Sequence, residues 1–97
     1  MVVVIEDQMH AEMHGTFGTV EQAFAELVRR AALAWDEPPN RCPCISWRKC
    51  GREYEILEYD DAVQPWRVSR RFGSLEVSSG GVVWSGDFSG GRLPTVG

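Results

Sequence analysis

The sequence lacks a long hydrophobic run. No stretch of its 97 residues approaches the roughly 18 apolar residues that a transmembrane helix needs. The first ten residues, MVVVIEDQMH, hold a short apolar run that ends at Glu6 and Asp7, without the basic start and longer apolar core of a signal peptide. We therefore expect a cytoplasmic protein that does not bind a membrane.

The familiar signatures of catalysis are also missing. The chain has no glycine-rich phosphate loop before a helix, no nucleophile elbow, and no carboxylate pair outside runs that read as solvated faces. Internal repeats are absent as well. The sequence predicts a non-enzymatic protein without a cofactor, and an enzyme with an unrecognised site is the last of three alternatives.

Cysteine is scarce, and the count is odd. All three cysteines lie in one stretch, RCPCISWRKCG, at residues 41–51. An odd number of cysteines in a chain without an export signal favours reduced thiols over a disulfide framework.

The composition that is present is that of one ordinary globular domain. Hydrophobic residues make up 43% of the chain and charged residues 25%, a mixture too apolar for disorder. We expect a single domain over residues 1–85, followed by a flexible tail rich in glycine and serine over 86–97. The net charge of −4 is unevenly spread, because residues 41–52 are basic without an acid and residues 53–61 are acidic without a base.

Residues 2–14 alternate between apolar and polar side chains, which is typical of a half-buried strand. Asp7 falls in phase with the apolar set, so either the strand is bulged there or EDQ is a tight turn. Because thirteen residues is long for one strand, the pattern favours a hairpin.

One amphipathic helix is predicted over residues 20–34. Thr19 precedes Gln22 by three residues, a spacing typical of a capping box, and Pro38 and Pro39 end the segment. The residues at helical spacing on its apolar face are Val20, Phe24, Leu27, Val28 and Ala31.

Further strands are predicted after the cysteine stretch. EYEILEYD (53–60) and WRVSRRF (66–72) read as strands, and SLEV (74–77) with GVVW (81–84) reads as a hairpin joined by SSGG. The fold class is therefore α+β, with one amphipathic helix packed on a mostly antiparallel sheet of about four to six short strands.

Several of these stretches resemble a group of small uncharacterised bacterial proteins. The resemblance is carried by HGTF, WDEPPN, SWRKCGREYEILEYD and LEVSSGGVVW, and its most specific part is an SWRxCGREYEI-like stretch. It implies a single bacterial domain and brings no activity or site residue with it.

The leading functional hypothesis is binding of a protein partner, or of a second copy as a homo-dimer. Trp47 lies inside the acid-free basic segment beside Arg48 and Arg52, and Trp and Arg are the residues most enriched at interface hot spots. A nucleic acid is a less suitable partner, because the net negative charge and the acidic run after Arg52 would repel it.

The alternative is a small zinc-binding protein. Its ligands would be Cys42, Cys44 and Cys50 with His10 or His14, a Cys3His set. Two residues usually separate the cysteines of a zinc knuckle, whereas CPC has one, a proline without a backbone donor. Reduced thiols are therefore the favoured interpretation.

Overall fold

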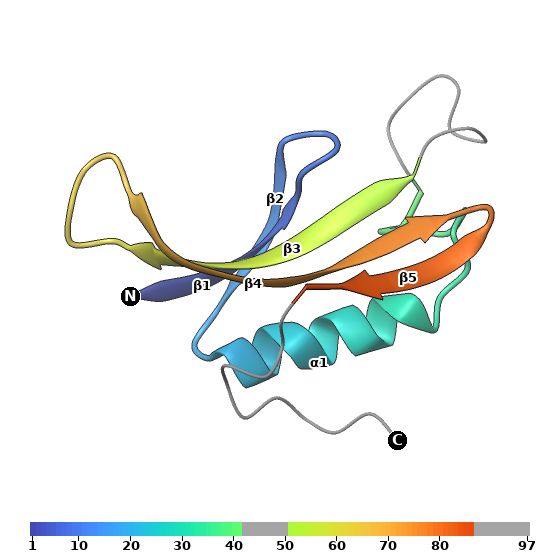
Figure 1. Cartoon of the computed structure of the whole chain (residues 1–97), viewed down its shortest axis with the longest axis horizontal. Helices are drawn as coiled ribbons and strands as arrows, with labels where there is room; N and C mark the ends of the chain where they lie inside the picture. The colour runs from blue at the N-terminus through green and yellow to red at the C-terminus, as the bar shows by residue number, and fades with distance from the viewer. Residues whose placement is uncertain (42–50, 87–97) are drawn as a thin grey trace.

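A computed structural model describes residues 1–41 and 51–86. In this part of the chain five strands form one antiparallel sheet in the order β2-β1-β3-β4-β5, and a single helix lies on one face of it (Figure 1). The elements are β1 (Val2–Asp7), β2 (Glu12–Phe17), α1 (Val20–Ala31), β3 (Arg52–Asp60), β4 (Arg67–Ser78) and β5 (Gly81–Ser85). The predicted α+β class is confirmed.

The predicted N-terminal hairpin is present, but its turn comes later than EDQ. β1 continues through Asp7, and residues 8–11 form the turn, with Ala11 in the left-handed region at a φ of 54°. Asp7 therefore keeps its place in the strand, in phase with Val3 and Ile5, and its side chain lies on the side of the sheet that α1 covers.

The predicted start of the helix is confirmed. Thr19 is the N-cap, and its Oγ1 accepts a hydrogen bond of 3.1 Å from the backbone N–H of Gln22. The Gln22 side chain in turn accepts from the backbone N–H of Gly18 at 2.9 Å. The first bond satisfies a donor that a helix start leaves without an intrahelical partner, and the second fixes the residue before the cap.

The helix ends at Ala31, earlier than the predicted residue 34. Asn40 lies beside this end: it is buried and donates from Nδ2 to the carbonyl of Arg30 at 2.8 Å, with longer contacts to the carbonyls of Leu33 and Ala34. A side chain from beyond the helix thus satisfies one acceptor of its last turn and two carbonyls of the segment after it.

The segments 66–72 and 74–77, predicted as separate strands, belong to the single strand β4. The register with β3 shifts between Glu55 and Leu57, so that Phe72 and Gly73 lie opposite the one residue Ile56. This irregularity bends the strand without ending it, as a β-bulge does.

The core lies between α1 and the sheet. Phe24 and Leu27 are buried there as predicted, while Val28 and Ala31 are partly buried at its margin. The core side chains are Val3, Ile5, Ala23, Phe24, Leu27, Tyr54, Ile56, Phe72, Leu75 and Val77.

Within residues 1–41 and 51–86, no helix has both the length and the apolar character needed to cross a membrane. The predicted C-terminal tail falls almost entirely on residues 87–97, which lie outside the described residues.

Candidate functional site

The strand β5 ends the sheet on the side of β4, and all five of its residues are exposed. Its sequence, GVVWS, contains no charged residue and no proline. Proteins usually protect an edge strand with charges, proline or a bulge, because an open edge can pair with another chain. Neither charge nor proline protects this one.

Both faces of β5 carry apolar side chains. Val82 and Trp84 pair with Val77 and Leu75, and therefore lie on the side of α1, whereas Val83 pairs with Glu76 and lies on the opposite face. Val82, Val83 and Trp84 are exposed by 41%, 54% and 39%. A second strand placed along β5 would therefore contact apolar side chains on both faces.

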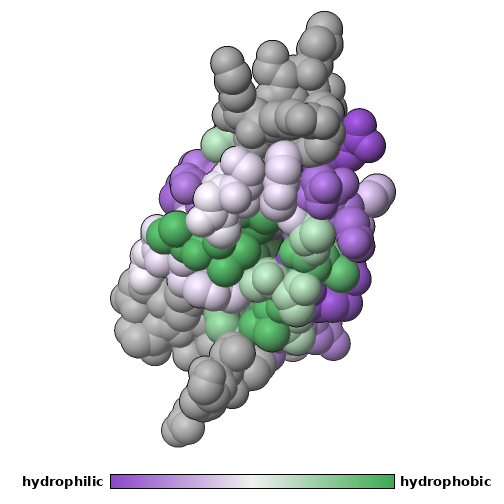
Figure 2. Space-filling model, turned by 90° about the vertical axis from the view of Figure 1, so that its right-hand side faces the viewer, coloured by the Kyte–Doolittle hydropathy of each residue, from purple (hydrophilic) through white to green (hydrophobic). Residues whose placement is uncertain are grey.

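An apolar groove of about 290 Å³ adjoins β5. Its lining comes from the end of α1, the segment after it and the β4–β5 turn: Ala31, Leu33, Trp35, Val77, Ser78, Ser79, Gly81 and Val82. Figure 2 shows the corresponding side of the molecule, where hydrophobic surface gathers in the middle of the view. The groove opens beside the apolar edge, so the two form one surface.

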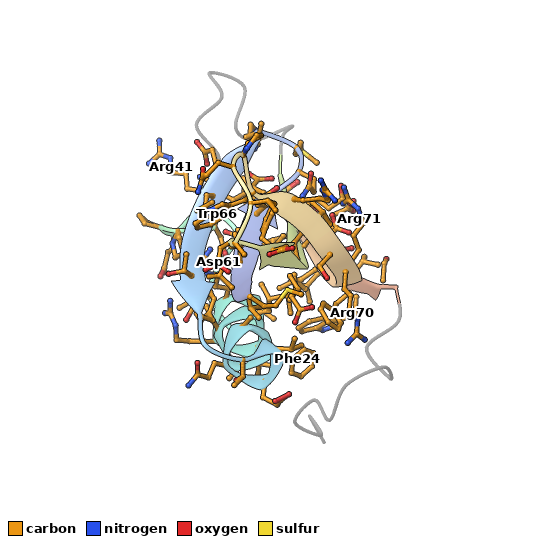
Figure 3. The ribbon with its side chains drawn as sticks, turned by 90° about the vertical axis from the view of Figure 1, so that its left-hand side faces the viewer. Phe24, Arg41, Asp61, Trp66, Arg70 and Arg71 are labelled. Carbon is orange, nitrogen blue, oxygen red and sulfur yellow. The ribbon has the colours of Figure 1, made fainter. Side chains whose placement is uncertain are left out.

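The arginines of β4 lie beyond the reach of β5, whereas Glu76 of β4 pairs with Val83. The register pairs β5 with Ser74–Ser78 only, which leaves the first half of β4 as an edge of its own. Figure 3 shows Arg70 and Arg71 leaving this half on opposite sides, Arg70 with its guanidinium 4.7 Å above the Phe72 ring. Arg71 is bonded to Glu55 at 2.8 Å. The uncharged edge is therefore confined to β5.

A second cluster of functional groups surrounds Arg52, the first residue of the central strand β3, and extends toward β1 and β2. Arg52 is only 7% exposed, and its Nη1 donates to Asp7 Oδ2 at 2.8 Å and to Glu12 Oε1 at 2.6 Å. Its Nη2 donates to the carbonyl of Arg41 at 2.8 Å. The guanidinium thus joins β1, β2 and β3 to the chain that follows α1.

Asp7 is fully buried and held as a carboxylate. It accepts hydrogen bonds from the backbone N–H groups of Met9 and Glu53, and its Oδ2 lies 2.7 Å from Nδ1 of His10. Burial alone would raise the pKa of Asp7, but the bonds from His10, the Glu53 backbone and Arg52 outweigh it and hold the pKa below its ordinary value.

His14 links this cluster to the helix. Its Nδ1 lies 2.9 Å from Nη1 of Arg30, and because a guanidinium can only donate, Nδ1 must accept. The ring proton of neutral His14 then sits on Nε2, which faces Glu12 Oε1 at 3.1 Å. Arg30 also donates to Glu26 at 2.7 Å. A continuous polar chain therefore runs from α1 to β2.

Three possible metal ligands converge in this cluster. One ligand atom each from Asp7, Glu12 and His14 lie within 4.8 Å of one another. Arg52 Nη1 donates to both carboxylates and lies 3.3 Å from His14 Nε2. The guanidinium already supplies the positive charge that a divalent cation would bring, and the cluster as it stands is an ion-pair network.

The structure places one member of the predicted partner surface away from solvent. Arg52 was expected to be an exposed donor, but it is buried because Asp7, in phase with the core of β1, requires a cation. Trp47 and Arg48 lie outside the described residues.

Of the predicted zinc ligands, too, some lie inside and some outside the described residues. Cys42, Cys44 and Cys50 lie outside the described residues. The two histidines are described, and His10 contacts Asp7 while His14 contacts Glu12 and Arg30.

Comparison with known proteins yields no match, whether with protein-family models, with curated proteins or with solved structures. The class of the chain therefore rests on its fold, a single helix on a five-stranded antiparallel sheet.

Proposed function

We propose that this chain is a protein-binding module that takes up an extended segment of another polypeptide along β5. The supporting observation is the edge itself, five exposed residues without a charge or a proline at the end of an antiparallel sheet. Addition of a strand to such an edge is a recurring mode of peptide recognition, in which main-chain hydrogen bonds give affinity and pockets for alternate side chains give selectivity.

The groove beside β5 gives the bound segment a preferred composition. A strand along β5 directs every second side chain to the side of α1, where the groove has an apolar lining and a rim with Ser78 and Ser79. On the opposite face, Val83 is flanked by Glu76 of β4. The segment should therefore carry apolar side chains toward the groove and neutral or basic ones on the other face.

Selection from a library of random linear peptides against the immobilised full chain tests this proposal. Val83→Lys puts a charge on the edge at an exposed position, and Thr16→Lys is the matched control on β2, where Thr16 is also exposed. We expect enriched peptides to alternate apolar residues, to bind Thr16→Lys like the native chain, and to lose at least about tenfold in affinity for Val83→Lys.

The backbone amides of the chain provide the second readout. Bound peptide should shift the resonances of β5 and of the groove, and leave β2 unchanged. Peptides that bind Val83→Lys as tightly as the native chain, or that shift amides elsewhere, would overturn the proposal.

A further inference from the structure

The partner that β5 fits best is β5 of a second copy of this chain, and we propose that two copies pair through it in antiparallel orientation about a two-fold axis beside Val83. This inference rests on the proposed function, because it uses the same edge. The axis sets Val83 opposite Val83 of the second copy, and Val82 opposite its Trp84. Such an interface is isologous, with the same surface contributed twice.

The order of side chains along β5 suits this pairing. A small residue stands at each end, Gly81 and Ser85, and Val82 and Trp84 flank the central Val83 on the other face. Each Val82 therefore meets a Trp84, which makes two contacts between an aromatic and a β-branched side chain, a favourable cross-strand pair. In this register no two large aromatic side chains oppose each other, and the small residues Gly81 and Ser85 face each other at both ends.

Charge favours a second copy at this edge in particular. The chain has a net charge of −4, so two copies repel each other on average. The segment from Leu75 to Ser85 carries one charge, Glu76, and Glu76 stands one strand behind the edge. Pairing through β5 thus brings the copies together through a segment that adds little repulsion.

The pairing also brings the second copy next to the groove. Val82 is part of the groove lining, and the pairing puts Trp84 of the second copy directly opposite it. A two-fold axis perpendicular to the sheet keeps both helices on one side, so this indole arrives on the side of α1, where the groove opens. The indole of each copy therefore lies beside the groove of the other, next to Val82.

The size of the contact sets its strength. A pair of five-residue strands with two indoles covers far less than the roughly 1,200–2,000 Å² of a stable interface. We therefore expect a reversible dimer that forms as the protein concentration rises and dissociates on dilution.

Sedimentation of the full chain over a wide concentration range tests the association, and a cysteine trap tests the register. Directly opposed side chains have Cβ atoms about 4.5–5.5 Å apart, close enough to link after a small adjustment. Val83→Cys should therefore form a disulfide between two copies at position 83. Val82→Cys is the control. The two copies of position 82 lie on the same face of the sheet, opposite to that of Val83, and face each other only diagonally, with Cβ atoms about 7–8 Å apart. Peptide mapping separates these links from any formed by the native cysteines.

Val83→Lys sets two like charges opposite each other on the axis, and should raise the dimer dissociation constant at least about tenfold, whereas Thr16→Lys should leave it unchanged. A native chain that stays monomeric, a dimer that persists in Val83→Lys, or equal linking at positions 82 and 83 would overturn self-pairing. If the chain is monomeric but β5 still binds selected peptides, self-pairing fails and the proposed function stands. If peptide binding ignores Val83→Lys, the proposed function itself fails.

Discussion

The two ends of the sheet differ in how their edges are treated. At one end, β2 carries Glu12 and His14, which turn inward and bond to Arg52 and Arg30, and Gly15 adopts a φ of 120° where the pairing with β1 is irregular. At the other end, β5 has no charge and every residue is exposed. The polar groups of β2 both protect the edge and tie it to the interior, while β5 offers a regular apolar edge to a partner.

The comparison implies that stability depends most on the β2 end. Replacing Arg52 with Met should lower the free energy of unfolding by about 3 to 5 kcal/mol, because it leaves the Asp7 carboxylate buried without its cation. Denaturant unfolding measures this. Arg71→Met, which breaks the exposed pair with Glu55, should cost less than about 1 kcal/mol.

If Arg52→Met does not fold, the double variant Arg52→Met, Asp7→Leu tests the same ion pair by its free energy of unfolding. Replacing both partners of a buried ion pair by apolar groups can be nearly neutral. Asp7→Leu also gives up the bonds from the Met9 and Glu53 amides, so the double variant should recover part of the loss. No recovery would mean that the coupling between Arg52 and Asp7 is small beside their other contacts.

Near β5, the residue whose replacement should lower stability most is Phe24. It is 7% exposed, and its ring centroid lies 5.4 Å from that of Trp84, so it supports the strand from below. Phe24→Ala should lower the free energy of unfolding by about 3 kcal/mol, and Phe24→Leu by much less. A loss below about 1 kcal/mol for Phe24→Ala would remove it from the core.

The β2 end should also accept a metal once its own cation is removed. In Arg52→Met, the ligand atoms of Asp7, Glu12 and His14 stay within 4.8 Å of one another. His14 can ligate through Nε2 once its ring proton moves to Nδ1, which gives up the bond from Arg30. Zn²⁺ at about 100 times its dissociation constant should then stabilise the variant by about 2.7 kcal/mol. Thermal unfolding with and without Zn²⁺ is the measurement.

The native chain serves as its control. We expect no change in its melting temperature on adding Zn²⁺ or a chelator, because Arg52 already lies among these ligands. A chelator that unfolds the native chain would instead favour the alternative zinc set of Cys42, Cys44 and Cys50 with a histidine.

Acid should weaken the polar chain between α1 and β2 by a smaller amount. Hydrogen bonds from Arg29 and Arg30 hold the pKa of Glu26 at about 2, against an ordinary 4.5. A lowered pKa contributes stability above the unfolded value, and this stability is lost as the pH falls from about 4.5 toward 2. Because Arg29 is largely exposed, we expect a loss of about 1 to 2 kcal/mol. Glu26→Gln should lack this part of the acid transition; an unchanged profile would contradict it.

The smallest effect should come from the edge variants themselves. Val83→Lys and Thr16→Lys both change exposed side chains, so each should alter the free energy of unfolding by less than about 0.5 kcal/mol in dilute solution. Denaturant unfolding checks this. A large loss of unfolding free energy in Val83→Lys would show that the Val83 side chain also stabilises the fold of the single chain.

The parts of the fold that the sequence predicts are those with local signals. The start of α1 follows from Thr19 and Gln22, three residues apart, and the two hairpins follow from alternation interrupted by turn residues. The end of α1 was predicted too late, and the side chain that bonds to its last turn, Asn40, lies nine residues beyond Ala31. Its role depends on tertiary contacts that no local pattern shows.

The candidate site illustrates the same limit. GVVW was predicted as a strand, but its position at the edge follows from the order of the strands, which alternation does not determine. Asp7 falls in phase with the apolar side chains of residues 2–14, and this is the signal in the sequence that points to a buried cation. Its partner Arg52 is 45 residues away, so the pair could be recognised only once β1 and β3 were side by side.

Asn40 has a consequence for the order in which the molecule opens. Its amide donates to the carbonyl of Arg30 in the last turn of α1, and its Oδ1 accepts from the hydroxyl of Tyr54 at 3.1 Å, in the middle of the sheet. The final turn of the helix therefore cannot fray as ordinary helix ends do without giving up a bond to β3. We expect the amide hydrogens of this turn to exchange with solvent about as slowly as those of β3, so that helix end and sheet open as one cooperative unit.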